Sequence, residues 1–117
     1  APLFLFDFEM TCRGWYLQDI AVILYYASNL NTMCQWQDRP AFESAFLDAF
    51  SETYQSLMPE VVLDPGLIQS HLLYRDLFVY AYVLDAWRGR SLSAGDQRLV
   101  DLLEANISSR RAAQGFH

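Results

Sequence analysis

The strongest constraint on the fold is that apolar residues recur at helical spacing in four segments of the chain. A proline, glycine or asparagine-containing interruption separates each segment from the next. The chain has 117 residues and 53% hydrophobic content, which is enough for one core and too little for two ordinary domains. We therefore expect residues 1–117 to form a single, mainly α-helical domain with about four helices.

The first two expected helices lie in the first half of the chain. One runs from residue 16 to about residue 28 and ends at the Asn29-Leu30-Asn31 interruption. The other starts after Asp38, with Pro40 at an early position where no backbone donor is needed, and stops at Pro59. Its apolar stripe, which we assign to the core, consists of Phe42, Phe46, Ala49, Phe50 and Leu57.

The two later helices carry their own start signals. Asp64-Pro65-Gly66 repeats the Asp-Pro signal and opens the longest helix, from residue 67 to about residue 87, which Arg88-Gly89 ends. This helix is apolar almost all round, so we expect it to be buried. Ser93 and Asp96 resemble a capping box at the start of a fourth helix, which leads out to a polar, arginine-containing tail.

The first residues follow a different pattern. Residues 3–8 form a short apolar run rich in aromatic side chains, which predicts a β-strand. A lone strand leaves its backbone groups unpaired, so we expect it to pair with a missing portion of a larger protein or with a second copy. The expected fold class is therefore mainly α, with about four helices preceded by one short N-terminal β-strand.

Charge and composition exclude several classes of partner and chemistry. The formal net charge is -6, and the 8 basic residues are scattered, so we expect no nucleic acid and no anionic membrane surface as a partner. All of these basic residues are arginine. Without lysine the chain supplies neither a Schiff-base amine nor the lysine that kinases place on ATP phosphates. We expect a cytoplasmic protein, because the sequence shows no signal peptide, no membrane span and no closely spaced pair of cysteines.

One block of residues near the N-terminus resembles a known family. The block consists of Leu5-Phe6-Asp7-Phe8-Glu9, then Gly14-Trp15, then Gln18-Asp19-Ile20-Ala21. It is similar to the metal-loop block of the aminoglycoside phosphotransferase/choline kinase-like enzymes. Residues 46–50 and 73–77 resemble later helices of that family. The resemblance implies the C-terminal, helical part of a protein-kinase-like fold. It begins just downstream of the position of the family's His-Gly-Asp catalytic loop, so it includes neither that loop nor the N-terminal lobe.

The resemblance also implies roles for individual residues. Asp7 would hold Mg²⁺ with ATP, and Glu9 stands where many relatives have a second aspartate that supports the metal. Gly14 belongs to the turn of the motif, and Asp19 matches an aspartate that orders the catalytic loop. The structural alternatives are a solvated strand-end acid at Asp7 and a favourable helix-dipole charge at Asp19. No catalytic and no substrate-binding residue is carried over.

Other polar and aromatic residues support no second site. Cys12, Cys34 and His71 match no zinc-binding spacing, so buried thiols and an ordinary helix histidine are expected. Aromatic residues that would shape a pocket for a cationic substrate, or else pack between helices, are Trp36, Tyr74, Tyr80 and Trp87. Asp76 and Asp85 are candidates for holding an amine-bearing substrate, but the sequence does not fix their directions.

Three hypotheses follow from these observations. The first is the C-terminal fragment of an ATP-dependent small-molecule phosphotransferase, which is catalytically incomplete alone and needs the missing N-terminal kinase portion. The second is a stand-alone, truncated kinase-like helical module that homodimerises or binds a partner without catalysis. An unrelated four-helix protein whose first residues mimic the motif is a third hypothesis.

Overall fold

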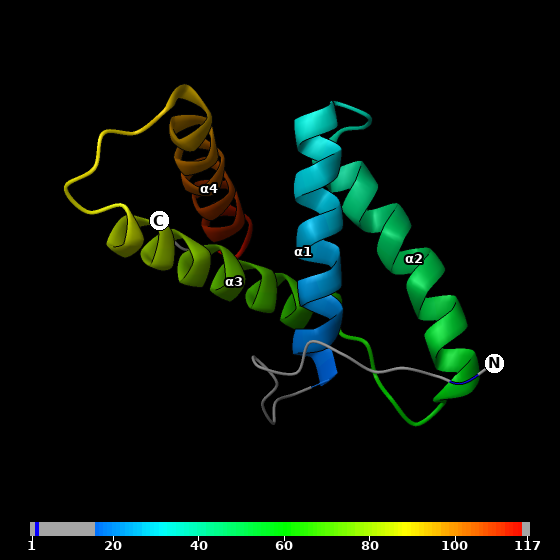
Figure 1. Cartoon of the computed structure of the whole chain (residues 1–117). Coiled ribbons are helices and arrows are strands. Elements are labelled where there is room, and N and C mark those ends of the chain that lie inside the picture. Colours follow the sequence, from blue (N-terminus) through cyan, green and yellow to red (C-terminus); the bar gives the residue numbers. More distant parts are fainter. Residues whose placement is uncertain (1, 3–15, 116–117) are drawn as a thin grey trace.

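The computed structural model describes residue 2 and residues 16–115, which contain four α-helices (Figure 1). The helices are α1 (Tyr16–Cys34), α2 (Arg39–Leu57), α3 (Pro65–Ala86) and α4 (Ala94–Ala113). The expectation of a mainly helical chain with about four helices is confirmed for this part of the chain. The predicted strand at residues 3–8 lies outside the described residues.

Helix α1 holds a central position between α2 on one side and the α3–α4 pair on the other (Figure 1). A short connection after α1 reverses the chain, so that α1 and α2 run antiparallel (Figure 1). Helix α3 packs against α1, and α4 packs against α3. Because α1 contacts both of its neighbours, it supplies more buried apolar side chains than any other described helix.

The core consists mainly of aliphatic side chains from α1, α3 and α4, together with Tyr25 of α1 and Leu63, which precedes α3. Partly buried aromatic residues of α2 lie at its edge. Leu24, Leu72 and Leu103 have no exposed surface, and they come from three different helices. Helix α2 adds a ladder of rings, in which Phe46 and Phe50 are stacked with centroids 5.9 Å apart. Burial of these apolar groups is the main favourable contribution to folding.

The predicted starts of the later helices are confirmed by their capping geometry. The Asp38 carboxylate accepts a hydrogen bond from Ala41 N at 3.4 Å, and Asp64 Oδ1 accepts one from Gly66 N at 2.8 Å. Before α4, Ser93 and Asp96 form the reciprocal bonds of a capping box. These side chains satisfy backbone donors that the first turn of a helix leaves without an intrahelical partner.

The predicted end of the first helix is wrong. Helix α1 continues through residues 29–31 to Cys34, and the chain turns only at Gln35, whose φ is 54°. Asn31 is fully buried in this extension, and its Nδ2 donates to Gln37 O at 2.8 Å. The asparagines stay helical because their side chains find partners in the folded protein, whereas in isolation they would favour a turn.

The core assignment of the α2 stripe is confirmed only in part. Phe42, Phe46 and Phe50 are partly buried against the core, but Ala49 is exposed and Leu57 is 75% exposed. Helices α1 and α2 diverge toward the C-terminal end of α2 (Figure 1), so the last turns of the stripe lie away from α1. Packing against the core therefore extends along the stripe as far as Phe50.

The expectation that α3 is buried all round is also wrong for the described residues. Its core-facing side includes Ile68, Leu72, Leu73 and Val83. The side chains of Tyr74, Phe78 and Tyr82 are between 45% and 68% exposed. Among residues 16–115, no helix is long and apolar enough to cross a membrane.

We expect Leu24→Ala to lower the free energy of unfolding by about 2 to 5 kcal/mol, because a fully buried leucine leaves a cavity at the contact between helices. Leu57→Ala is the matched control, since this leucine is 75% exposed and should change stability by less than about 0.5 kcal/mol. Urea denaturation followed by circular dichroism measures both. Equal losses in the two variants would contradict this description of the core.

Candidate functional site

Most of the residues that the family resemblance singles out lie outside the described residues. This holds for Asp7, Glu9 and Gly14. Asp19 is described, and it lies in the first turn of α1 with an exposed side chain. A negative charge in that position interacts favourably with the helix dipole. The location therefore fits the structural alternative for Asp19 and leaves its carboxylate accessible.

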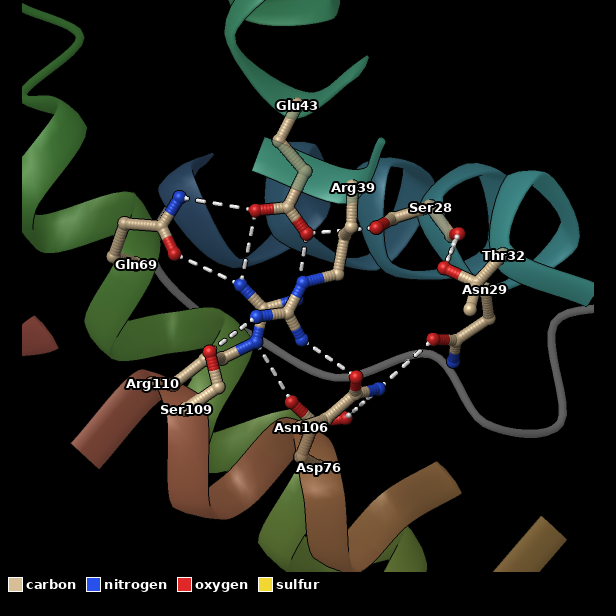
Figure 2. Close-up of polar contacts among 10 residues, drawn as sticks. All are labelled: Ser28, Asn29, Thr32, Arg39, Glu43, Gln69, Asp76, Asn106, Ser109 and Arg110. Carbon is tan, nitrogen blue, oxygen red and sulfur yellow. Dashed lines mark hydrogen bonds and ion pairs between the residues drawn. The ribbon is translucent and has the colours of Figure 1, made fainter. Parts of the chain in front are cut away.

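The most distinctive polar feature of the described chain is a buried ionic cluster around Arg110 (Figure 2). Arg110 Nη2 lies 2.7 Å from Glu43 Oε1 of α2, and Arg110 Nε lies 2.8 Å from Asp76 Oδ2 of α3. The three side chains are 2%, 6% and 0% exposed, respectively. One arginine on α4 thus joins carboxylates from two other helices inside the protein.

Neutral side chains complete the hydrogen bonding of the two carboxylates. Ser28 of α1 donates its hydroxyl to Glu43 Oε1 at 2.7 Å, and Gln69 of α3 donates its Nε2 to Glu43 Oε2 at 3.4 Å. Asn106 Nδ2 lies 3.4 Å from Asp76 Oδ1. All four described helices therefore contribute to the cluster, as Figure 2 shows. Buried charges require this degree of satisfaction, because an unpaired charge in the interior is strongly unfavourable.

Arg39 at the start of α2 is the second arginine of this region. Its Nη1 donates to Asn106 Oδ1 at 2.6 Å, and its Nη2 donates to Ser109 Oγ at 2.7 Å. Both partners are neutral side chains of α4. Within the described part of the chain, no carboxylate forms an ion pair with Arg39. The guanidinium therefore keeps donors that neither partner occupies.

The cluster shifts the pKa values of its members in different directions. Burial alone would raise the pKa of Glu43, but the hydrogen bonds and charge of Arg110, together with the Ser28 hydroxyl, hold it below its ordinary value. Burial raises the pKa of Asp76, and the charge of Arg110 offsets only part of that effect. Burial and the nearby charge of Arg110 lower the pKa of Arg39. Glu43 is therefore the carboxylate whose ionised form the fold favours.

Helical spacing explains how these side chains reach one place. Arg39 and Glu43 are four residues apart on α2, as are Asn106 and Arg110 on α4, so each pair occupies one helix face. The sequence contained a signal for this arrangement, namely polar residues at that spacing beside apolar stripes. We assigned Arg110 to a polar tail beyond the fourth helix, and this was wrong, because Arg110 is buried within α4.

The remaining candidate residues do not converge on a second site. His71 Nδ1 lies 2.8 Å from Gln18 Oε1, and Cys34 is exposed at the end of α1. Cys12 lies outside the described residues. Among the described residues, no group of three or more histidine, cysteine or acidic side chains could hold a metal ion.

The two aspartates considered for an amine-bearing substrate have different surroundings. Asp76 is buried and forms an ion pair with Arg110, so its carboxylate is not accessible to a substrate from solvent. Asp85 is exposed and pairs with Arg88 at 2.9 Å. Of the four aromatic candidates, Trp36 and Tyr74 are exposed, and Trp87 is partly buried. Tyr80 is also partly buried and donates its hydroxyl to Glu104 at 2.7 Å. These residues form no shared aromatic pocket.

Comparison with protein family models, with curated proteins and with solved structures finds no match for this chain.

We expect Arg110→Ala to reduce the free energy of unfolding by about 3 to 5 kcal/mol, because it leaves two carboxylates buried without their cation. Arg111→Ala is the matched control, since this neighbouring arginine is exposed and should cost less than about 0.5 kcal/mol. Chemical denaturation measures both values. Similar small losses in the two variants would show that the cluster does not contribute to stability.

The pKa of Glu43 gives a pH dependence with a definite sign. Its pKa in the folded state lies below the ordinary value of 4.5, so the stability from its ionisation is present above pH 4.5. That stability is lost as the pH falls through the folded-state pKa. The destabilisation caused by Glu43→Gln should therefore be largest near neutral pH and shrink below pH 4.5. Denaturation curves of both proteins across this pH range test it, and a constant difference would contradict it.

Proposed function

We propose that this chain is the C-terminal helical part of an ATP-dependent small-molecule phosphotransferase and is not catalytically complete alone. The observation that carries this proposal is the order of Asp7, Glu9 and Gly14 immediately before a helix whose first turn contains Asp19. That order resembles the metal-loop block of the aminoglycoside phosphotransferase/choline kinase-like family. The helical arrangement of residues 16–115 is compatible with it.

The chain's own acids define what it would contribute to such an enzyme. Carboxylate oxygens suit Mg²⁺, a hard cation that is usually bound by one or two carboxylates together with substrate phosphates. By the family resemblance, that role would fall to Asp7 with Glu9. Bound Mg-ATP would supply the phosphoryl group for transfer to a hydroxyl of a small molecule.

Asp19, which lies within the described residues, is compatible with the proposal as well as with the helix-dipole role. Its side chain is exposed in the first turn of α1, and none of its hydrogen bonds or ion pairs goes to another described side chain. An exposed carboxylate can accept backbone hydrogen bonds from a loop of the N-terminal kinase portion. That portion would also supply the catalytic aspartate and the phosphate-binding lysine, because the chain has no lysine.

The second candidate is a helical module that homodimerises without catalysis. Its support is the number of large apolar side chains that are exposed on the described helices, including Ile23, Tyr26, Tyr74, Phe78 and Tyr82. Contiguous exposed apolar surface is a feature of association sites. This candidate makes no use of Asp7 and expects no response to nucleotide.

Mg-ATP should raise the thermal midpoint of this chain, since a ligand at about one hundred times its Kd stabilises the folded state by about 2.7 kcal/mol. Asp7→Ala should abolish the rise, because it removes the proposed metal ligand. Asp48→Ala is the matched control, because this exposed acid of α2 lies in no proposed site, and it should preserve the rise. Differential scanning fluorimetry, with and without EDTA, measures the thermal midpoints of the original chain and of the two variants.

Light scattering on the same samples separates the two candidates. A nucleotide-dependent shift that needs Asp7 supports the phosphotransferase fragment. A stable dimer with no nucleotide response would overturn that proposal in favour of the non-catalytic module. A monomer without a nucleotide response would contradict both.

A further inference from the structure

A continuous apolar surface extends over α1 and α3, and we call it the α1–α3 face. Its members are large apolar side chains that are between 45% and 68% exposed, namely Ile23, Tyr26, Leu30, Tyr74, Phe78 and Tyr82. Arg75 joins the two helices, because its guanidinium carbon lies 5.7 Å from the centroid of the Tyr26 ring and 5.6 Å from that of Phe78. The Tyr74 and Phe78 rings are stacked, with centroids 6.4 Å apart. The other members lie one helical turn from these rings, so the side chains form a single surface.

The α1–α3 face is large enough for stable association. An aromatic side chain carries about 150 to 250 Å² of surface, so the exposed fractions of the four aromatic members correspond to about 350 to 550 Å². A standard-size interface buries about 800 Å² of each partner, and homodimer interfaces are about 65% apolar, which requires about 520 Å² of apolar surface. Ile23 and Leu30 add to the aromatic area. The face can therefore supply the apolar share of a homodimer interface.

The distribution of charge favours a second copy of the chain as the partner. Two molecules of net charge -6 repel each other, so they associate most readily through a surface without exposed acids. Residues 20–34 contain no charged residue, and the charged residues of 74–82 are Arg75 and Asp76. Asp76 is buried in the ionic cluster. The α1–α3 face thus presents no exposed carboxylate to an identical face, and it offers none to a basic partner.

The spacing of the α1 members suits contact between identical helices. Ile23, Tyr26 and Leu30 occupy positions i, i+3 and i+7, the spacing that lines up apolar side chains along the contact between paired helices. A two-fold axis brings the same surface of both copies together. We propose that two copies of this chain associate through their α1–α3 faces. The inference rests on the second candidate function, to which it assigns a surface, and it requires neither Asp7 nor nucleotide.

Size-exclusion chromatography with light scattering tests this surface on the full chain at micromolar concentrations. We expect the mass of two chains. Leu30→Glu should weaken the dimer about a hundredfold or more, because the two-fold axis brings two added carboxylates into an apolar interface. Tyr82→Glu makes the same change on α3, independently of α1. Leu57→Glu is the matched control, since this leucine is 75% exposed on α2 outside the face, and it should leave the dimer intact.

Circular dichroism verifies that each variant is folded, as expected for substitutions at exposed helix positions. A dimer that folded Leu30→Glu and Tyr82→Glu leave intact would overturn the assigned surface and retain the second candidate function. Equal dissociation by Leu57→Glu would also overturn the surface. A monomeric original chain would overturn both the surface and the second candidate function. The phosphotransferase proposal is judged separately by the Mg-ATP shift, which Leu30→Glu should preserve.

Discussion

The contact of Arg110 with Glu43 and Asp76 is the interaction on which the arrangement of the helices depends. It joins α4 to α2 and α3, and the Ser28 hydroxyl extends it to α1. Apolar packing alone favours many similar arrangements of four helices, because it has no direction. A buried ion pair is compatible with few arrangements, because any movement of the helices that separates the two groups leaves an unpaired charge in the interior.

The same cluster has an energetic cost that hydrophobic side chains would avoid. Two carboxylates and a guanidinium must be removed from water, and the burial that raises the pKa of Asp76 reflects this cost directly. Complete hydrogen bonding by Gln69, Asn106 and Ser28 offsets it. The cluster therefore contributes specificity of packing more clearly than it contributes net stability, and each of its members is sensitive to substitution.

The phosphotransferase proposal depends on acids that precede or begin α1, and Asp19 is the one of these that the structure describes. The ionic cluster around Arg110 instead joins side chains of α2, α3 and α4. Helix α1 supplies much of the core and reaches the cluster through the Ser28 hydroxyl.

The sequence by itself determined the number of helices in residues 16–115 and where three of them begin. Caps and prolines act within a single turn, so Asp38, Asp64 and Ser93 can be interpreted without knowledge of the fold. Only the tertiary structure decided that α1 continues through Asn29, because the Asn29 Oδ1 accepts a hydrogen bond from Asn106 Nδ2, which lies 77 residues away in the sequence. It also decided that Arg110 is buried, since its carboxylates lie 34 and 67 residues away in the sequence. Local propensity cannot encode a contact between groups that only packing brings together.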